Sequence, residues 1–159
     1  AASHTGSLAG ADALYDAIFA QAGLIRCQTV NELFDYAQVF AAGKALRGDK
    51  IAIVTNAGGP GIIATDMSEN SGLQLARFTD ETIKELHKHL PLTANFHNPV
   101  DVIGDAARDR YENTLATVLS DPNVDGVLII LTPQSMTDVM GTAEAIVKIA
   151  KNSMKPIVC

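Results

Sequence analysis

The chain has 159 residues, of which 47% are hydrophobic and 19% charged, so it can bury a core and is too apolar for a disordered linker. Its net charge of −6 and the lack of any dense run of Lys or Arg argue against a surface for nucleic acid or anionic membranes. No apolar run reaches the length of a membrane span, and the first residues lack the order of a signal peptide, so we expect a cytoplasmic protein. Cys27 and Cys159 have no CxxC spacing and no clustered histidines nearby, which predicts two buried thiols and no metal site.

The first third of the chain is predicted to contain two helices. Apolar residues at helical spacing begin at Asp12, and Gly23 is placed to end this helix before a short strand at 24–27. Thr29 and Glu32 form a capping-box pattern for a second helix that reaches about residue 46. Glycines and charged residues then interrupt the periodicity, which predicts a domain boundary there.

Beyond this boundary, short apolar strands alternate with amphipathic helices. Strands are predicted at 50–55, 73–78, near 98–104, at 126–131 and at 156–159. Helices are predicted at 62–70, from a Thr79 cap to Pro91, at 107–120 and around 140–150, the last marked by Met140, Ala143, Ile146, Val147 and Ala150. Strands that are apolar throughout and alternate with helices indicate a parallel sheet covered on both faces. The predicted fold class is therefore doubly wound, flavodoxin-like α/β.

A glycine-rich turn, Asn-Ala-Gly-Gly-Pro-Gly at 56–61, joins the strand at 50–55 to the next helix. Ligands of open α/β sheets bind outside the carboxyl ends of strands, and the free N–H groups of a helix start favour an anion. The spacing fits neither a Walker loop nor the GxGxxG dinucleotide turn. Phosphate is the predicted ligand, and a plain strand-to-helix turn with Pro60 at the first helical position is an equally open alternative.

His4 lies in a segment of small residues, 3–10, that would let an imidazole swing between two places. Taken alone, a histidine in such a segment is more often an exposed loop residue than a catalyst. His87, His89 and His97 are predicted to have surface or capping roles.

Motifs along the whole chain resemble the ADP-forming acyl-CoA (acetyl-CoA) synthetases, which are relatives of succinyl-CoA synthetase. Segments 3–10, 15–16, 21–26 and 32–35 look like the phosphohistidine segment of that family, and segments 54–61, 98–101, 121–125 and 131–134 look like the ligase domain that follows it. By this resemblance, residues 1–46 are the C-terminal part of a preceding ligase domain, and residues 47–159 are a flavodoxin-like ligase domain that is truncated at its C-terminal end. The chain would then be a fragment of a longer polypeptide.

The resemblance implies interconversion of acyl-CoA, phosphate and ADP with the free acid, CoA and ATP, through an acyl phosphate and a phosphohistidine. It makes His4 the phosphorylated residue, because an imidazole that is neutral near neutral pH can carry a covalent intermediate. The residues expected at the phosphate are Asn56, Ala57, Gly58, Gly59 and Gly61, and those with a weaker claim to the same cleft are Asn98, Asp101 and Gln134.

The resemblance also implies partners that supply the rest of the enzyme. These are an upstream CoA-binding domain and an ATP-grasp nucleotide-binding domain or beta subunit. CoA, ADP or ATP, and Mg would act in the complete enzyme, and this fragment would bind none of them and be inactive alone.

Two other interpretations come from different functional classes. A regulatory ligase-like module of a protein lysine acetyltransferase has the same domain order but has lost the catalytic histidine, so His4 argues against it. A flavodoxin-like module for FMN or for phosphoryl transfer to an aspartate has less support, because the turn lacks a hydroxyl-rich phosphate loop and the early strands do not end in an acidic pair.

Overall fold

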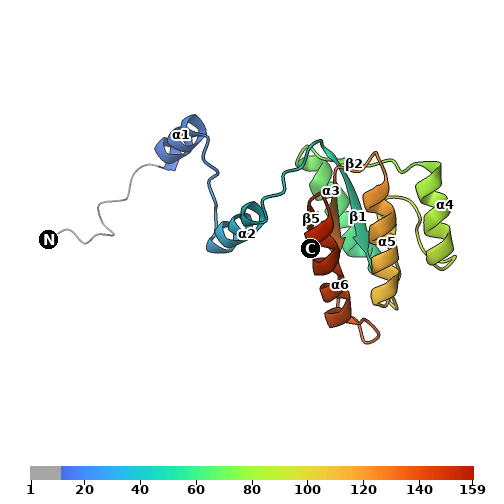
Figure 1. Cartoon of the computed structure of the whole chain (residues 1–159). Helices are drawn as coiled ribbons and strands as arrows, with labels where there is room; N and C mark the ends of the chain where they lie inside the picture. The colour runs from blue at the N-terminus through green and yellow to red at the C-terminus, as the bar shows by residue number, and fades with distance from the viewer. Residues whose placement is uncertain (1–11) are drawn as a thin grey trace. The chain divides into compact units, whose positions relative to one another are not determined.

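The computed structural model describes residues 12–159, and the chain divides into two units, Ala1–Gly43 and Lys44–Cys159. The described part of the first unit holds helices α1 (Asp12–Ala22) and α2 (Val30–Ala41), shown in blue in Figure 1. Neither helix buries a side chain within the described chain; Phe34, for example, is 62% exposed.

Local sequence signals set the ends of these two helices. Gly23 ends α1 with a φ of 66°, and the N–H of Glu32 donates to Thr29 Oγ1 at 3.1 Å, so the predicted cap of α2 is confirmed. The second helix ends at Ala41, earlier than predicted, because Gly43 takes a φ of 68°.

The strand predicted at 24–27 is wrong, since those residues pair with no strand within residues 12–159. Arg26 instead turns back toward α1, where its guanidinium lies 2.9 Å from Asp12 and 2.6 Å from Asp16.

The second unit is a parallel sheet flanked by helices (Figure 1). Its elements are β1 (Lys50–Thr55), α3 (Gly58–Asn70), β2 (Gln74–Leu75), α4 (Asp80–His89), β3 (Val100–Asp101), α5 (Arg108–Ser120), β4 (Gly126–Ile130), α6 (Val139–Asn152) and β5 (Ile157–Val158). The strand order is β2-β1-β4-β5, β3 also pairs with β1, and these four strand pairings are parallel. The predicted doubly wound α/β class is confirmed.

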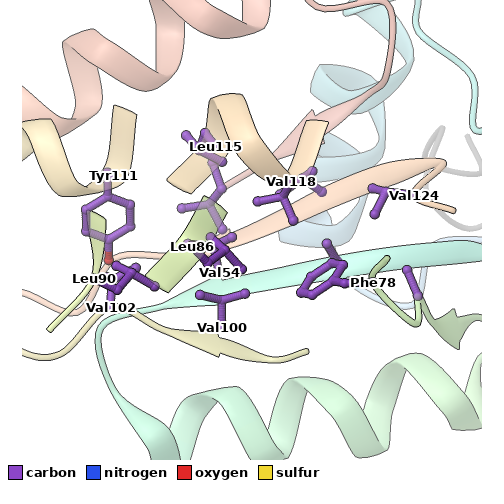
Figure 2. Packing of buried hydrophobic residues seen from close by; sticks show 14 of the residues in the cluster. Val54, Phe78, Leu86, Leu90, Val100, Val102, Tyr111, Leu115, Val118 and Val124 are labelled. Carbon is purple, nitrogen blue, oxygen red and sulfur yellow. The ribbon is translucent and has the colours of Figure 1, made fainter. Parts of the chain in front are cut away.

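The two faces of β1 pack against different helices. Ala52 and Val54 join a core that contains Leu86 of α4 and Leu115 of α5. Figure 2 shows Val54, Leu86 and Leu115 in this core. Thr55 points the other way, toward α3. Because successive side chains of a strand alternate between faces, one apolar strand supplies both layers.

The strand predicted at 73–78 is shortened to β2 because two segments share one edge of β1. Ile51 pairs with Leu75 of β2, whereas Val54 pairs with Val100 of β3. The edge of β1 therefore passes from β2 to β3 along its length.

The buried residues of α6 are Thr142, Ala145 and Ile146, whereas Met140 and Val147 are 71% and 53% exposed. The prediction of two buried thiols is wrong: Cys159, which follows the edge strand β5, is exposed, and Cys27 is half-buried. None of the helices within residues 12–159 has the length and apolar character needed to span a bilayer.

Candidate phosphate site at the carboxyl edge of the sheet

Three strands end at the same level at the carboxyl edge of the sheet. Thr55 of β1 is in register with Asp101 of β3 on one side and with Ile130 of β4 on the other. This register gathers the turn after β1, Asp101 and the segment after β4 at one place. Such an edge is where ligands of open α/β sheets bind.

Helix α3 begins at Gly58, four residues earlier than predicted, so the glycine-rich turn is the first turn of the helix. Its N-cap is Ala57, which offers no capping side chain. Thr55 Oγ1 accepts the N–H of Ala57 at 3.0 Å, and the N–H of Gly61 donates to Ala57 O at 3.2 Å. Pro60 has no N–H. The N–H groups of Gly58 and Gly59 therefore find no acceptor within residues 12–159, and both residues are exposed.

The glycines of this turn differ in the space around them. A Cβ on Gly61 would lie 3.0 Å from Thr55 Cγ2, whereas a Cβ on Gly59 would have no heavy atom of the described chain within 4 Å. Gly61 therefore lets the helix approach β1, and Gly59 leaves room beside the free N–H groups.

Asn56 is brought to the edge, but its side chain is only 2% exposed and faces the segment after β4. Its Nδ2 donates to Thr132 O, and the N–H of Thr132 donates to its Oδ1, both at 2.8 Å. Gln134 Nε2 donates to the carbonyl of Asn56 at 3.3 Å. Asn56 and Gln134 are thus linked to each other.

Asp101 flanks the start of α3. Its Oδ1 accepts the N–H of Ile103 at 2.9 Å, and its Oδ2 would be 3.5 Å from a Cβ placed on Gly58. A negative charge is favourable at a helix N-terminus, so a phosphate at this end of α3 would share it with the Asp101 side chain.

Tyr111 of α5 reaches the same edge from the core. Its hydroxyl donates to Ile130 O at 3.1 Å, and the side chain is fully buried. Burial raises the pKa of this phenol, and the nearby Cys159 and Asp101 side chains raise it further. Tyr111 therefore stays protonated and acts as a hydrogen-bond donor to the strand end.

Asn98 lies beside the middle of β1, and its side chain is hydrogen-bonded to the backbone of the sheet. Its Oδ1 accepts the N–H of Ile53 at 2.9 Å, and its Nδ2 donates to Ile51 O at 2.8 Å and to Ala76 O at 3.1 Å. These bonds fill the gap between β2 and β3 on the edge of β1. The side chain does not join Asn56, Asp101 and Gln134 at the helix start.

Two residues of this arrangement were missed from the sequence. Thr55 accepts a hydrogen bond from the N–H of Ala57, and the backbone of Thr132 binds the side chain of Asn56. Thr55 could have been found as the polar end of an otherwise apolar strand, but Thr132 acts through its backbone, which leaves no signal in the residue type. His4, the predicted phosphohistidine, lies outside the described residues.

Metal ligands do not cluster in the described chain. Within residues 12–159, no group of three or more His, Cys, Asp or Glu side chains is arranged to hold a metal ion. The groups at this edge that could bind a ligand are the N–H groups of Gly58 and Gly59, which have no acceptor within residues 12–159 and suit an anion.

The chain matches known protein families and characterised relatives. Residues 1–40 match the succinyl-CoA ligase like flavodoxin domain, and residues 51–158 match the Ligase-CoA domain. The chain is 46% identical over 147 residues to acetate–CoA ligase (ADP-forming) I of Archaeoglobus fulgidus, covering 92% of this chain and 21% of that protein. It is 40% identical over 161 residues to the alpha subunit of acetate–CoA ligase (ADP-forming) II of Pyrococcus furiosus, covering 99% and 35%.

A solved structure agrees with these relatives. An acetyl-coenzyme A synthetase 1 of Ca. Korarchaeum cryptofilum, in complex with phosphate and ADP, superposes with a TM-score of 0.83 at 34% identity, covering 98% of this chain and 34% of that one. The chain thus spans about a third or less of the proteins named here, and these are ligases, which does not favour the acetyltransferase alternative. The chain belongs to the Ligase-CoA domain family, and the resemblance of its motifs to ADP-forming acyl-CoA synthetases is confirmed.

Proposed function

We propose that this chain is the phosphate-handling part of an ADP-forming acyl-CoA ligase, which interconverts acyl-CoA, ADP and phosphate with the acid, CoA and ATP. The observation that carries the proposal is the pair of free N–H groups on Gly58 and Gly59 at the start of α3. They open onto the edge of the sheet where Asp101 and Gln134 also lie. A helix start of this kind binds phosphate without a Lys or Arg.

The proposed mechanism uses His4 as the carrier of the phosphoryl group. Attack of phosphate on acyl-CoA forms an acyl phosphate and releases CoA. The neutral imidazole then attacks phosphorus, so that an N–P bond forms, the bond from phosphorus to the acyl oxygen breaks, and the carboxylate leaves. A terminal phosphate oxygen of ADP attacks the phosphohistidine, which yields ATP and regenerates the imidazole.

The helix start contributes to these transfers by holding the phosphoryl group. Charge at a helix terminus is stabilised by about 0.3 to 2 kcal/mol, which is modest beside a catalytic barrier. Phosphoryl transfer depends mainly on positioning and on stabilising charge at the oxygens. We therefore assign Asn56, Ala57, Gly58, Gly59 and Gly61 to placing the phosphate, with Asp101 and Gln134 beside it.

The remaining parts of the enzyme are proposed from the relatives. An upstream CoA-binding domain and an ATP-grasp domain or beta subunit would supply CoA and nucleotide recognition, and Mg would accompany the nucleotide. We place the boundary between the two parts of this chain after residue 46 and the protein in the cytoplasm.

Phosphorylation of the complete enzyme that contains this chain tests the proposal. Incubation with ATP labelled at the γ-phosphate should give acid-labile, base-stable label on His4, and His4→Ala should abolish both the label and net ATP synthesis. His97→Ala is the matched control, because His97 is an exposed loop histidine. Near-normal ATP synthesis by His4→Ala would contradict the assignment.

A further inference from the structure

We infer that Asn56 is a positioning residue, which holds the turn before α3 so that the N–H groups of Gly58 and Gly59 face the phosphate, and does not bind phosphate through its own side chain. This inference rests on the proposed function. The residue type alone does not indicate this role. From the sequence, an asparagine at such a turn is expected to contact the ligand with its side chain.

The side-chain amide of Asn56 is already hydrogen-bonded within the chain. The Nδ2 donates to Thr132 O and the Oδ1 accepts the N–H of Thr132, both at 2.8 Å. Two antiparallel bonds to one residue fix the orientation of the side chain as well as its distance. With 2% of the residue exposed, contact with a phosphate would require both bonds to break.

The backbone of Asn56 is bound to the same segment after β4. Gln134 Nε2 donates to Asn56 O at 3.3 Å. The Gln134 side chain in turn packs against Gly104, where an added Cβ would collide with it. The N–H of Gln134 donates to Thr137 Oγ1 at 3.2 Å, which holds this segment in its turn. Side chain and carbonyl of Asn56 are therefore both anchored to residues 132–134.

Asn56 lies between Thr55, the last residue of β1, and Ala57, the N-cap of α3. Thr55 Oγ1 accepts the N–H of Ala57 at 3.0 Å and donates to its carbonyl at 2.9 Å. With Asn56 held on one side and Ala57 on the other, the path from β1 into α3 is determined up to Gly58. The first residues with free N–H groups follow directly, so any rotation at Asn56 changes where they point.

Phosphate titration of the full 159-residue chain labelled with ¹⁵N tests the inference. In the parent, inorganic phosphate should shift the amide signals of Gly58 and Gly59 saturably. In Asn56→Ala these signals should already have moved before phosphate is added, and the affinity for phosphate should fall about tenfold. Asn56→Asp keeps the acceptor for Thr132 but loses the donor, so its free-state shifts should lie between those of the parent and Asn56→Ala.

Two further variants separate positioning from general weakening of the fold. Asn123→Ala also loses a bond from a side chain to a distant carbonyl, that of Arg77 at 2.8 Å, and should leave both the glycine signals and phosphate affinity unchanged. Gln134→Ala removes only the bond to Asn56 O, and its exposed position lets the chain fold. It should move the Gly58 and Gly59 signals in the same direction as Asn56→Ala, by less.

The outcomes distinguish this inference from the proposed function. If phosphate does not shift Gly58 and Gly59 in the parent, the phosphate site itself is wrong and the inference falls with it. If the parent binds phosphate but Asn56→Ala and Gln134→Ala leave the free-state signals of the two glycines in place, the inference alone is overturned. Weaker binding by Asn56→Ala without any free-state shift would show direct contact with the ligand.

Discussion

Two glycines in the first turn of α3 should respond in opposite ways to an added methyl group. At Gly61 the new carbon would lie 3.0 Å from Thr55 Cγ2 and 3.8 Å from Pro99 Cβ, whereas at Gly59 it would meet no heavy atom of residues 12–159 within 4 Å. Thr55 cannot turn aside, because it is 1% exposed and its hydroxyl makes two hydrogen bonds with Ala57. The methyl group of Gly61→Ala would therefore be too close to Thr55, which cannot move, whereas the methyl group of Gly59→Ala would enter open space.

The expected magnitudes follow from these surroundings. Overpacking of a filled site costs about 1 to 3 kcal/mol, and alanine is favoured over glycine in a helix by about 0.8 to 1 kcal/mol. For Gly61→Ala the two effects oppose each other and leave a net loss of about 1 kcal/mol in the free energy of unfolding. For Gly59→Ala only the second acts, so stability should rise by up to about 1 kcal/mol. The two variants should differ by about 2 kcal/mol.

Urea unfolding of the parent and both variants, followed by circular dichroism, measures this difference. Gly59→Val extends the test to function, since the fold should survive while single-turnover phosphorylation in the complete enzyme slows through crowding of the anion. The steric reasoning would be refuted if Gly59→Ala lost more than about 1 kcal/mol, or if Gly61→Ala were as stable as the parent. An unchanged phosphorylation rate with unchanged stability in Gly59→Val would mean that the turn only connects β1 to α3.

Three further predictions concern the core and its edges. Asn98→Ala should lose at least about 2 kcal/mol in urea unfolding, because backbone groups of β1 lose their partners; a loss under about 0.5 kcal/mol would contradict that role. Tyr111→Phe should lose about 1 kcal/mol through its bond to Ile130, and equal stability would show that the bond contributes nothing. Burial raises the pKa of Asp121, but hydrogen bonds from Thr82, Thr79 and Asn123 outweigh burial, so the pKa is lowered on folding. The carboxylate of Asp121 therefore stabilises the fold at neutral pH, and this contribution is lost as pH falls below about 4. Asp121→Asn should have a lower free energy of unfolding at pH 7 and lose less of it in acid. An unchanged dependence of stability on pH in this variant would contradict the role of Asp121.

The sequence by itself determined the features that depend on neighbouring residues. The caps at Thr29 and Thr79 were predicted because a hydroxyl binds an N–H only three residues away. The strands β1 and β4 were predicted because an unbroken apolar run between turns suits a strand buried on both faces. The alternation of these elements was sufficient for the parallel α/β fold, and the motifs were sufficient for the family.

Only the tertiary structure decided the roles of two asparagines that looked alike in the sequence. Asn56 directly follows β1 and Asn98 lies just before β3; Asn56 was predicted at the phosphate, and Asn98 with a weaker claim to the same cleft. Asn98 binds the backbone of β1 45 and 47 residues away, and Asn56 binds Thr132 76 residues away. The length of β2 was also decided by the tertiary structure, because β3 pairs with the C-terminal end of β1 and leaves only its first residues to β2. An amide side chain donates and accepts with equal ease, so its partner is set by which backbone groups the folded chain leaves unpaired beside it.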